Sequence, residues 1–130
     1  MTIDHVGIVV SSLDGATAYY TTTFGLRAIN GRIVDPLQDV ELQFLEDDDG
    51  ARLELICPLS TDSPVARALT QGGGLNHICY RVADLESSMG TLVRHRAFAL
   101  PYLGALSAYG TVTLIWRFWL SKQGRYAIDR

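Results

Sequence analysis

Mostly apolar residues run from Ile3 to Val10 around His5 and Gly7, and this pattern predicts a β-strand that is packed on both faces. Because side chains alternate along a strand, His5 would share one face with Gly7 and Val9. The chain therefore opens with a buried strand that carries a histidine.

A helix is predicted directly after this strand. Ser11 or Ser12 can cap its N-terminus, apolar and aromatic residues continue at helical spacing to Phe24, and Gly25 ends it. Three further strands are predicted over residues 28–34, 40–46 and 51–57, and the last two are joined by the acidic turn of residues 47–50. The first half of the chain is therefore predicted to be β-α-β-β-β.

The second half repeats this pattern after a short connecting helix. That helix is predicted over residues 65–70, with Ser63 and Pro64 at its start and the glycines of residues 72–74 after its end. A strand over residues 75–82 and a helix capped by Asp84 follow. Farther on we predict a strand at 98–103, a loop at 104–110, and closing strands at 111–120 and 125–129.

The two halves are related by a fixed lag in the sequence. Adding 72 to the number of His5 gives His77, and the same lag relates Leu13 to Leu85. Similarity at a fixed lag indicates two copies of one supersecondary unit. We therefore predict an α+β fold of two βαβββ modules in one domain of residues 1–130, with module 1 at about 1–57, a connector at about 58–74 and module 2 at about 75–130.

Composition narrows the class of protein. A hydrophobic fraction of 48% in 130 residues is enough for one buried core, and a formal net charge of −3 gives no electrostatic case for nucleic-acid binding. Residues 1–10 lack the basic and apolar pattern of a leader, so we expect no signal peptide. The longest apolar run, at 111–120, is too short to span a membrane. Cys57 and Cys79 lie in apolar strands. We therefore expect buried thiols, a cytoplasmic location and a small-molecule substrate.

Four residues are candidate metal ligands. His5 and His77 occupy equivalent strands, Glu54 lies in an apolar Leu-Glu-Leu-Ile stretch, and Asp129 lies in the last predicted strand. A packed histidine or a solvated carboxylate would explain any one of them alone, but the repeat favours ligation by the first three, and both explanations stay open for Asp129. Imidazole and carboxylate together suit Co, Ni, Mn, Zn or Fe.

The stretches Ile3-Asp4-His5-Val6-Gly7-Ile8-Val9-Val10 and Gly72-Gly73-Gly74-Leu75-Asn76-His77-Ile78 carry a resemblance to a known family, as does Tyr19-Tyr20 with Phe24-Gly25-Leu26. The chain resembles the vicinal oxygen chelate (glyoxalase/bleomycin-resistance/dioxygenase) superfamily, and within it most of all the methylmalonyl-CoA epimerases. The resemblance implies paired βαβββ modules whose mixed sheets curl around a central divalent metal. It also implies that the ligands are His5, Glu54, His77 and Asp129, although the family's last ligand is normally Glu.

The resemblance further implies a reaction. In such epimerases the metal holds the thioester oxygen of an acyl-CoA, and paired carboxylates move the proton at the α-carbon. The catalytic candidates here are Glu41 and Asp129. Glu41 matches a family base only if one residue is deleted, since the position without a gap is Leu42, and an outward-facing structural Glu41 is an equal alternative.

The predicted function is that of a metal-dependent isomerase or lyase, most like methylmalonyl-CoA epimerase or, more distantly, glyoxalase I. We expect a small-molecule substrate such as an acyl-CoA thioester, no nucleic-acid or membrane partner, and a homodimer. One alternative is a non-catalytic drug-binding or resistance protein on the same fold, with Tyr109, Trp116 and Trp119 lining an apolar pocket. A second alternative is a metal-dependent thiol transferase of the fosfomycin-resistance type. Whether the modules pair within one chain or across a dimer stays open.

Overall fold

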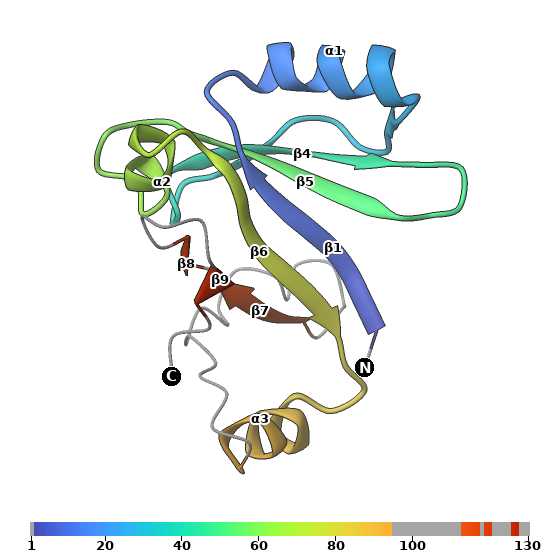
Figure 1. Cartoon of the computed structure of the whole chain (residues 1–130), viewed down its shortest axis with the longest axis vertical. Coiled ribbons are helices and arrows are strands. Elements are labelled where there is room, and N and C mark those ends of the chain that lie inside the picture. The colour runs from blue at the N-terminus through green and yellow to red at the C-terminus, as the bar shows by residue number, and fades with distance from the viewer. Residues whose placement is uncertain (1, 95–112, 118, 121–125, 128–130) are drawn as a thin grey trace. The chain divides into compact units, whose positions relative to one another are not determined.

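The computed structural model describes residues 2–94, 113–117, 119–120 and 126–127. Its elements, shown in Figure 1, are β1 (Thr2–Val9), α1 (Leu13–Phe24), β2 (Arg27–Ala28), β3 (Ile33–Asp35), β4 (Val40–Glu46), β5 (Arg52–Pro58), α2 (Ala66–Thr70), β6 (Gly74–Arg81), α3 (Leu85–Arg94), β7 (Thr113–Arg117), β8 (Trp119–Leu120) and β9 (Tyr126–Ala127). The predicted mixed α+β fold is confirmed.

The strands that carry the site form a mixed sheet. Hydrogen bonds join them in the order β2-β4-β5-β1-β6-β7, β3 pairs with β4, and β8 pairs with β9 in a separate ladder. β1 and β5 are parallel, whereas β4 and β5 are antiparallel. The chain divides into two compact units, His5–Asn76 and a second unit made of Met1–Asp4 with His77–Arg130. The division into a single domain with a connector at 58–74 stays a prediction.

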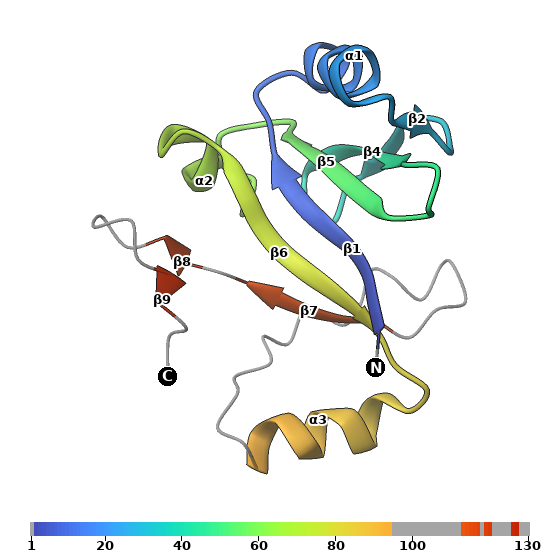
Figure 2. The same cartoon turned by 45° about the vertical axis from the view of Figure 1, so that its right-hand side comes forward.

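The unit His5–Asn76 has a different apolar layer on each face of its strands. On one face α1 lies along β4 and β5, as Figures 1 and 2 show from two directions, and Leu13 packs there with Leu45, Leu55 and Cys57. On the opposite face lies a second cluster, made of Val9, Val40, Ile56 and Val65. Burying both faces explains why β1 and β5 are so rich in apolar residues.

The start and end of α1 are those predicted. The Ser12 side chain accepts a hydrogen bond from the Gly15 amide at 3.1 Å, and Gly25 ends the helix in the left-handed conformation at φ 73°. The Gly25 amide donates to the Thr21 carbonyl at 3.1 Å. A serine cap and a glycine stop are local signals, which is why the sequence identifies them.

The prediction of one continuous strand over residues 28–34 is wrong. Two short strands, β2 and β3, pair with β4 instead, and the chain between them leaves the ladder. Asn30 lies in this gap, where its side-chain oxygen accepts from the Phe44 amide at 3.2 Å and also contacts the Gln43 side-chain nitrogen at 3.0 Å. Because a side chain satisfies the Phe44 amide, no backbone carbonyl is needed at that point of the ladder.

The helix α2 also begins differently from the prediction. Its N-cap is Val65 without a side-chain hydrogen bond, while the Ser63 hydroxyl donates to the Gln38 carbonyl at 3.2 Å. The glycine run does end the helix. At Gly73 φ is 70°, and a Cβ atom there would lie 2.6 Å from the Val9 carbonyl oxygen, so glycine allows the close approach to β1.

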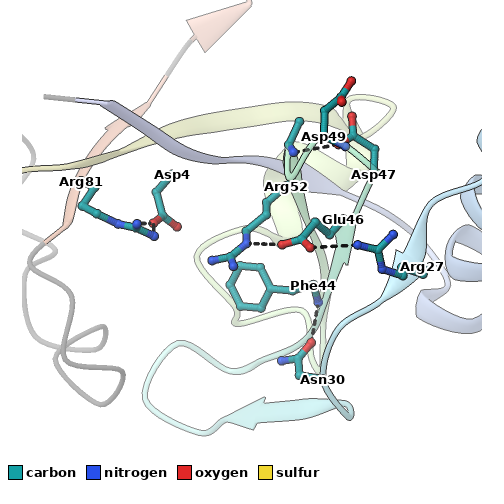
Figure 3. A network of polar contacts seen from close by, with 10 residues as sticks. Asp4, Arg27, Asn30, Phe44, Glu46, Asp47, Asp49, Arg52 and Arg81 are labelled. Carbon is teal, nitrogen blue, oxygen red and sulfur yellow. Dashed lines mark hydrogen bonds and ion pairs between the residues drawn. The ribbon is translucent and has the colours of Figure 1, made fainter.

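In the second unit β6 pairs antiparallel with β7, and His77 lies opposite Arg117. The Arg81 guanidinium donates through Nε to the Asp4 carboxylate at 3.1 Å, a pair drawn in Figure 3. At the start of α3 the Asp84 carboxylate accepts from the Ser87 amide at 2.6 Å, as the predicted cap requires. The elements predicted at 98–103 and 104–110 lie outside the described residues.

Candidate metal centre

His5 and Glu54 lie on the same face of two neighbouring parallel strands. In the ladder Gly7 of β1 is opposite Glu54 of β5, and side chains two residues apart on one strand share a face. His5 therefore belongs to the face of Gly7 and Glu54, as the alternation predicted.

The two side chains are buried and close. His5 Nε2 lies 3.4 Å from Glu54 Oε2, and the residues are only 2% and 6% exposed. The Phe44 ring meets the His5 ring edge to face, with centroids 5.2 Å apart, and Phe44 is directly opposite Glu54 in the β4–β5 ladder. A buried carboxylate is unfavourable unless it is paired or bound to a cation, so this arrangement is one that a metal ligand would need.

His77, on β6, is also buried, at 6% exposed. His5, Glu54 and His77 form a group that could hold a metal ion, because each offers one ligand atom and these atoms all lie within 4.8 Å of one another. This mixture of two imidazoles and a carboxylate is typical of sites for Zn and related divalent cations. Asp129, the fourth predicted ligand, lies outside the described residues.

Glu41 is placed away from this group. In the β4–β5 ladder Glu41 is opposite Cys57, whereas Phe44 is opposite Glu54, so Glu41 and Glu54 point to opposite faces. Glu41 Oε2 lies 3.1 Å from Arg32 Nη1. Asp14 and then Glu41 raise the pKa of the Arg32 guanidinium, because both carboxylates stabilise its charged form. The structure thus brings Glu41 to the α1 side and not to His5 and Glu54.

Leu42, the position reached without a gap, is on the site face. It is opposite Ile56 in the ladder and packs against the cluster that contains Val9 and Val40. The face that carries Glu54 therefore presents a leucine at this point of β4. Its apolar side chain can help to keep water out, but it cannot transfer a proton.

Sequence reasoning missed Phe44 and Arg52 as parts of this face. Arg52 is two residues before Glu54 on β5 and opposite Glu46 on β4, with Arg52 Nε 2.8 Å from Glu46 Oε2. Alternation around Glu54 was the signal that could have found Arg52, because residues 52, 54 and 56 of a strand must share a face.

The other predicted residues are two cysteines and three aromatic residues. Cys57 and Cys79 are buried free cysteines, as predicted. The side chains of Trp116 and Trp119, and all of Tyr109, lie outside what the structure describes. None of the described helices has the length and apolar character needed to cross a membrane.

The sequence and the fold have known relatives. The chain is 38% identical over 91 residues to the uncharacterized protein YqjC of Bacillus subtilis. This alignment covers 69% of this chain and 64% of YqjC, so the chain spans less than two thirds of that protein's length. It is 32% identical over 109 residues to the ethylmalonyl-CoA/methylmalonyl-CoA epimerase of Cereibacter sphaeroides, covering 79% of this chain and 80% of the relative.

Among solved structures, a variant of the Streptomyces coelicolor methylmalonyl-CoA epimerase in complex with 2-nitronate-propionyl-CoA matches with a TM-score of 0.72 and 25% identity, over 89% of this chain and 87% of that one. A family model described as the glyoxalase/bleomycin resistance protein/dioxygenase superfamily matches residues 4–102. These matches confirm the family predicted from the His5 and His77 motifs. The chain belongs to the glyoxalase/bleomycin resistance protein/dioxygenase superfamily.

Proposed function

We propose that this protein is a metal-dependent enzyme that moves a proton at the carbon next to the carbonyl of an acyl thioester, in the manner of methylmalonyl-CoA epimerases. The observation that carries the proposal is the buried group of His5, Glu54 and His77. Relatives with epimerase names, including the one from Cereibacter sphaeroides, support the choice of reaction and of acyl-CoA as substrate.

The residues present fit a divalent cation. His5, Glu54 and His77 would hold it, and Asp129, which lies outside the described residues, is proposed as a fourth ligand. When bound, such a cation supplies Lewis-acid stabilisation of the negative charge that develops on a carbonyl oxygen. Co, Ni, Mn, Zn and Fe all suit this donor set.

The chain's own residues supply orientation and exclusion of water. Phe44 packs its ring against His5, which limits the orientations of the imidazole, and Leu42 closes the neighbouring part of the same face. A proton-transferring carboxylate is still required. Asp129 is proposed for this role, since Glu41 lies on the α1 side of β4. A homodimer and a cytoplasmic location stay predictions of the sequence.

The test combines metal analysis with isotope exchange. Purified protein should bind one equivalent of Co, Ni, Mn, Zn or Fe, and in heavy water the metal-loaded protein should exchange the α-proton of methylmalonyl-CoA for deuterium. Glu54→Gln should lose most of the metal affinity, because an amide oxygen is a neutral and weaker ligand. Glu86→Gln makes the same change at an exposed position in the first turn of α3 and should keep metal and activity. Protein that binds one equivalent of metal but exchanges no α-proton of methylmalonyl-CoA would contradict the proposed enzymatic function.

A second candidate function has one observation in its favour. Leu42 gives the site face of β4 an apolar residue in place of a proton-transfer group. A small-molecule binding protein of the same superfamily needs an apolar wall and no base. Protein that neither retains nor gains a divalent metal, and that exchanges no acyl-CoA, would favour this candidate.

A further inference from the structure

Arg52 lies at the border of the candidate metal centre. Residues alternate along β5, so Arg52, Glu54 and Ile56 share one face. The β1–β5 register pairs Val6 with Leu53, and the next pair toward the start of β1 would be His5 with Arg52. Neighbouring strands are about 4.8 Å apart, so the backbone of Arg52 lies directly beside that of His5.

The Arg52 guanidinium uses only one of its hydrogen-bond donors to bind Glu46. Its Nε lies 2.8 Å from Glu46 Oε2, and no other hydrogen bond of this side chain is present among the described residues. A guanidinium carries five N–H donors, so the two Nη groups retain four of them in a planar fork that matches a carboxylate. The side chain is 38% exposed, which leaves it accessible to a ligand.

Glu46 fixes the direction of this cation. Arg27 Nη2 lies 3.2 Å from Glu46 Oε1, so the carboxylate is held between two arginines. Figure 3 shows Arg52 on the Phe44 side of Glu46 and Arg27 on the other side. Phe44 is opposite Glu54 in the β4–β5 ladder and contacts His5. Arg52 is therefore the member of this ion-pair network that lies on the side of the candidate ligands.

We propose that Arg52 binds the free carboxylate of a 2-carboxyacyl thioester and so selects this class of substrate, a proposal that rests on the proposed function. In such a substrate the thioester carbonyl group and the carboxylate are both attached to the α-carbon. A group that recognises the carboxylate must therefore lie close to the metal ligands, as Arg52 does beside His5. Bidentate contact with the fork also fixes the rotation of the α-carbon relative to the catalytic groups.

The experiment compares two substrates that differ in one group. Methylmalonyl-CoA and isobutyryl-CoA share the thioester and the α-proton, and a methyl group in the second replaces the carboxylate of the first. Deuterium exchange at the α-carbon is measured against substrate concentration for each. Arg52→Gln should raise KM for methylmalonyl-CoA about tenfold to hundredfold, the value of a lost charge-assisted hydrogen bond, and should leave KM for isobutyryl-CoA within about twofold. Arg52→Lys keeps the charge without the fork and should give an intermediate KM.

Arg27→Gln is the matched control, because it removes an ion pair to the same Glu46 on the side away from Phe44. It should leave both KM values unchanged. Equal KM for methylmalonyl-CoA in wild type and Arg52→Gln would overturn the proposal while leaving the enzyme intact. Equal increases in Arg27→Gln and Arg52→Gln would also overturn it, since the effect would then come from the ion-pair network. Wild-type protein that exchanges neither substrate would reject the proposed function itself.

Discussion

The placement of Glu41 leads to a sharp prediction about Glu41→Gln. Glu41 lies on the α1 side of β4, opposite Cys57, with its carboxylate 3.1 Å from Arg32 Nη1. A general base must come within about 2.6–3.2 Å of the proton that it removes, directly or through one water. Because Glu54 is on the other face of the ladder, Glu41 cannot reach a substrate held there. We expect exchange rates of Glu41→Gln to stay within about twofold of wild type.

The test is decisive because Glu41→Gln would slow exchange strongly if Glu41 were the general base. Losing a general base slows a reaction by about a hundredfold to ten-thousandfold. Losing the ion pair to Arg32 affects only stability. The side chains of Arg32 and Glu41 are 43% and 19% exposed, and solvent screens an exposed pair of this kind, so it contributes little to stability. Its loss should therefore lower Tm only slightly.

The assay follows the α-proton signal of methylmalonyl-CoA by NMR in heavy water, with thermal unfolding measured in parallel. Arg32→Gln removes the same ion pair from its other end, together with the ion pair between Arg32 and Asp14, and is the control for stability. Both variants should show a small decrease in Tm and an unchanged exchange rate. Exchange slowed a hundredfold in Glu41→Gln, with Arg32→Gln near wild type, would refute the assignment of Glu41 to the α1 side.

Three further predictions concern the fold. Gly73→Ala should lower the free energy of unfolding in urea by about 1–3 kcal/mol or more, because its Cβ would lie 2.6 Å from the Val9 carbonyl at φ 70°, whereas Gly31→Ala, with nothing within 4 Å, should be nearly neutral. Ser12→Ala should lower it by about 1 kcal/mol through loss of the cap. Burial, and then the charge of Glu41, raise the pKa of the Cys57 thiol. As the pH rises past the ordinary thiol pKa of about 9, native protein keeps the Cys57 proton longer than unfolded protein does. Wild type should therefore lose stability with rising pH more steeply than Cys57→Ala, and Cys57 should react slowly with Ellman's reagent at pH 8.

The elements that the sequence identified depend on short-range signals. The strand β1, the cap at Ser12 and the stop at Gly25 are each determined within a few residues of chain, so pattern and capping preferences are sufficient. His5 and Glu54 were named as candidate ligands for a related reason. Each is a polar residue in an apolar strand, and such a residue needs a partner once the strand is buried.

The interruption between β2 and β3 depends on a contact that local patterns do not contain. Residues 28–34 have the composition of one strand, but Asn30 binds the Phe44 amide, 14 positions along the chain. The geometry of this contact is set by the pairing of β4 with β5, which holds Phe44 in place. A sequence window around Asn30 carries no information about that pairing, so the prediction of a continuous strand was wrong.

The candidate for the catalytic carboxylate shows the same limit at the site itself. A shift of one residue along a strand moves every side chain to the other face, so the choice between Glu41 and Leu42 could not be made until the ladder pairs were known. The register pairs Leu42 with Ile56 and leaves Glu46 as the carboxylate of β4 on the site face. Glu46 is already bound by Arg27 and Arg52. In the proposed function a base for proton transfer would therefore come from an element other than β4. If Asp129 alone serves as that base, its carboxylate reaches the α-carbon from one side only. Exchange of one stereoisomer should then be faster than its conversion to the other, a stereochemical consequence of having leucine at position 42.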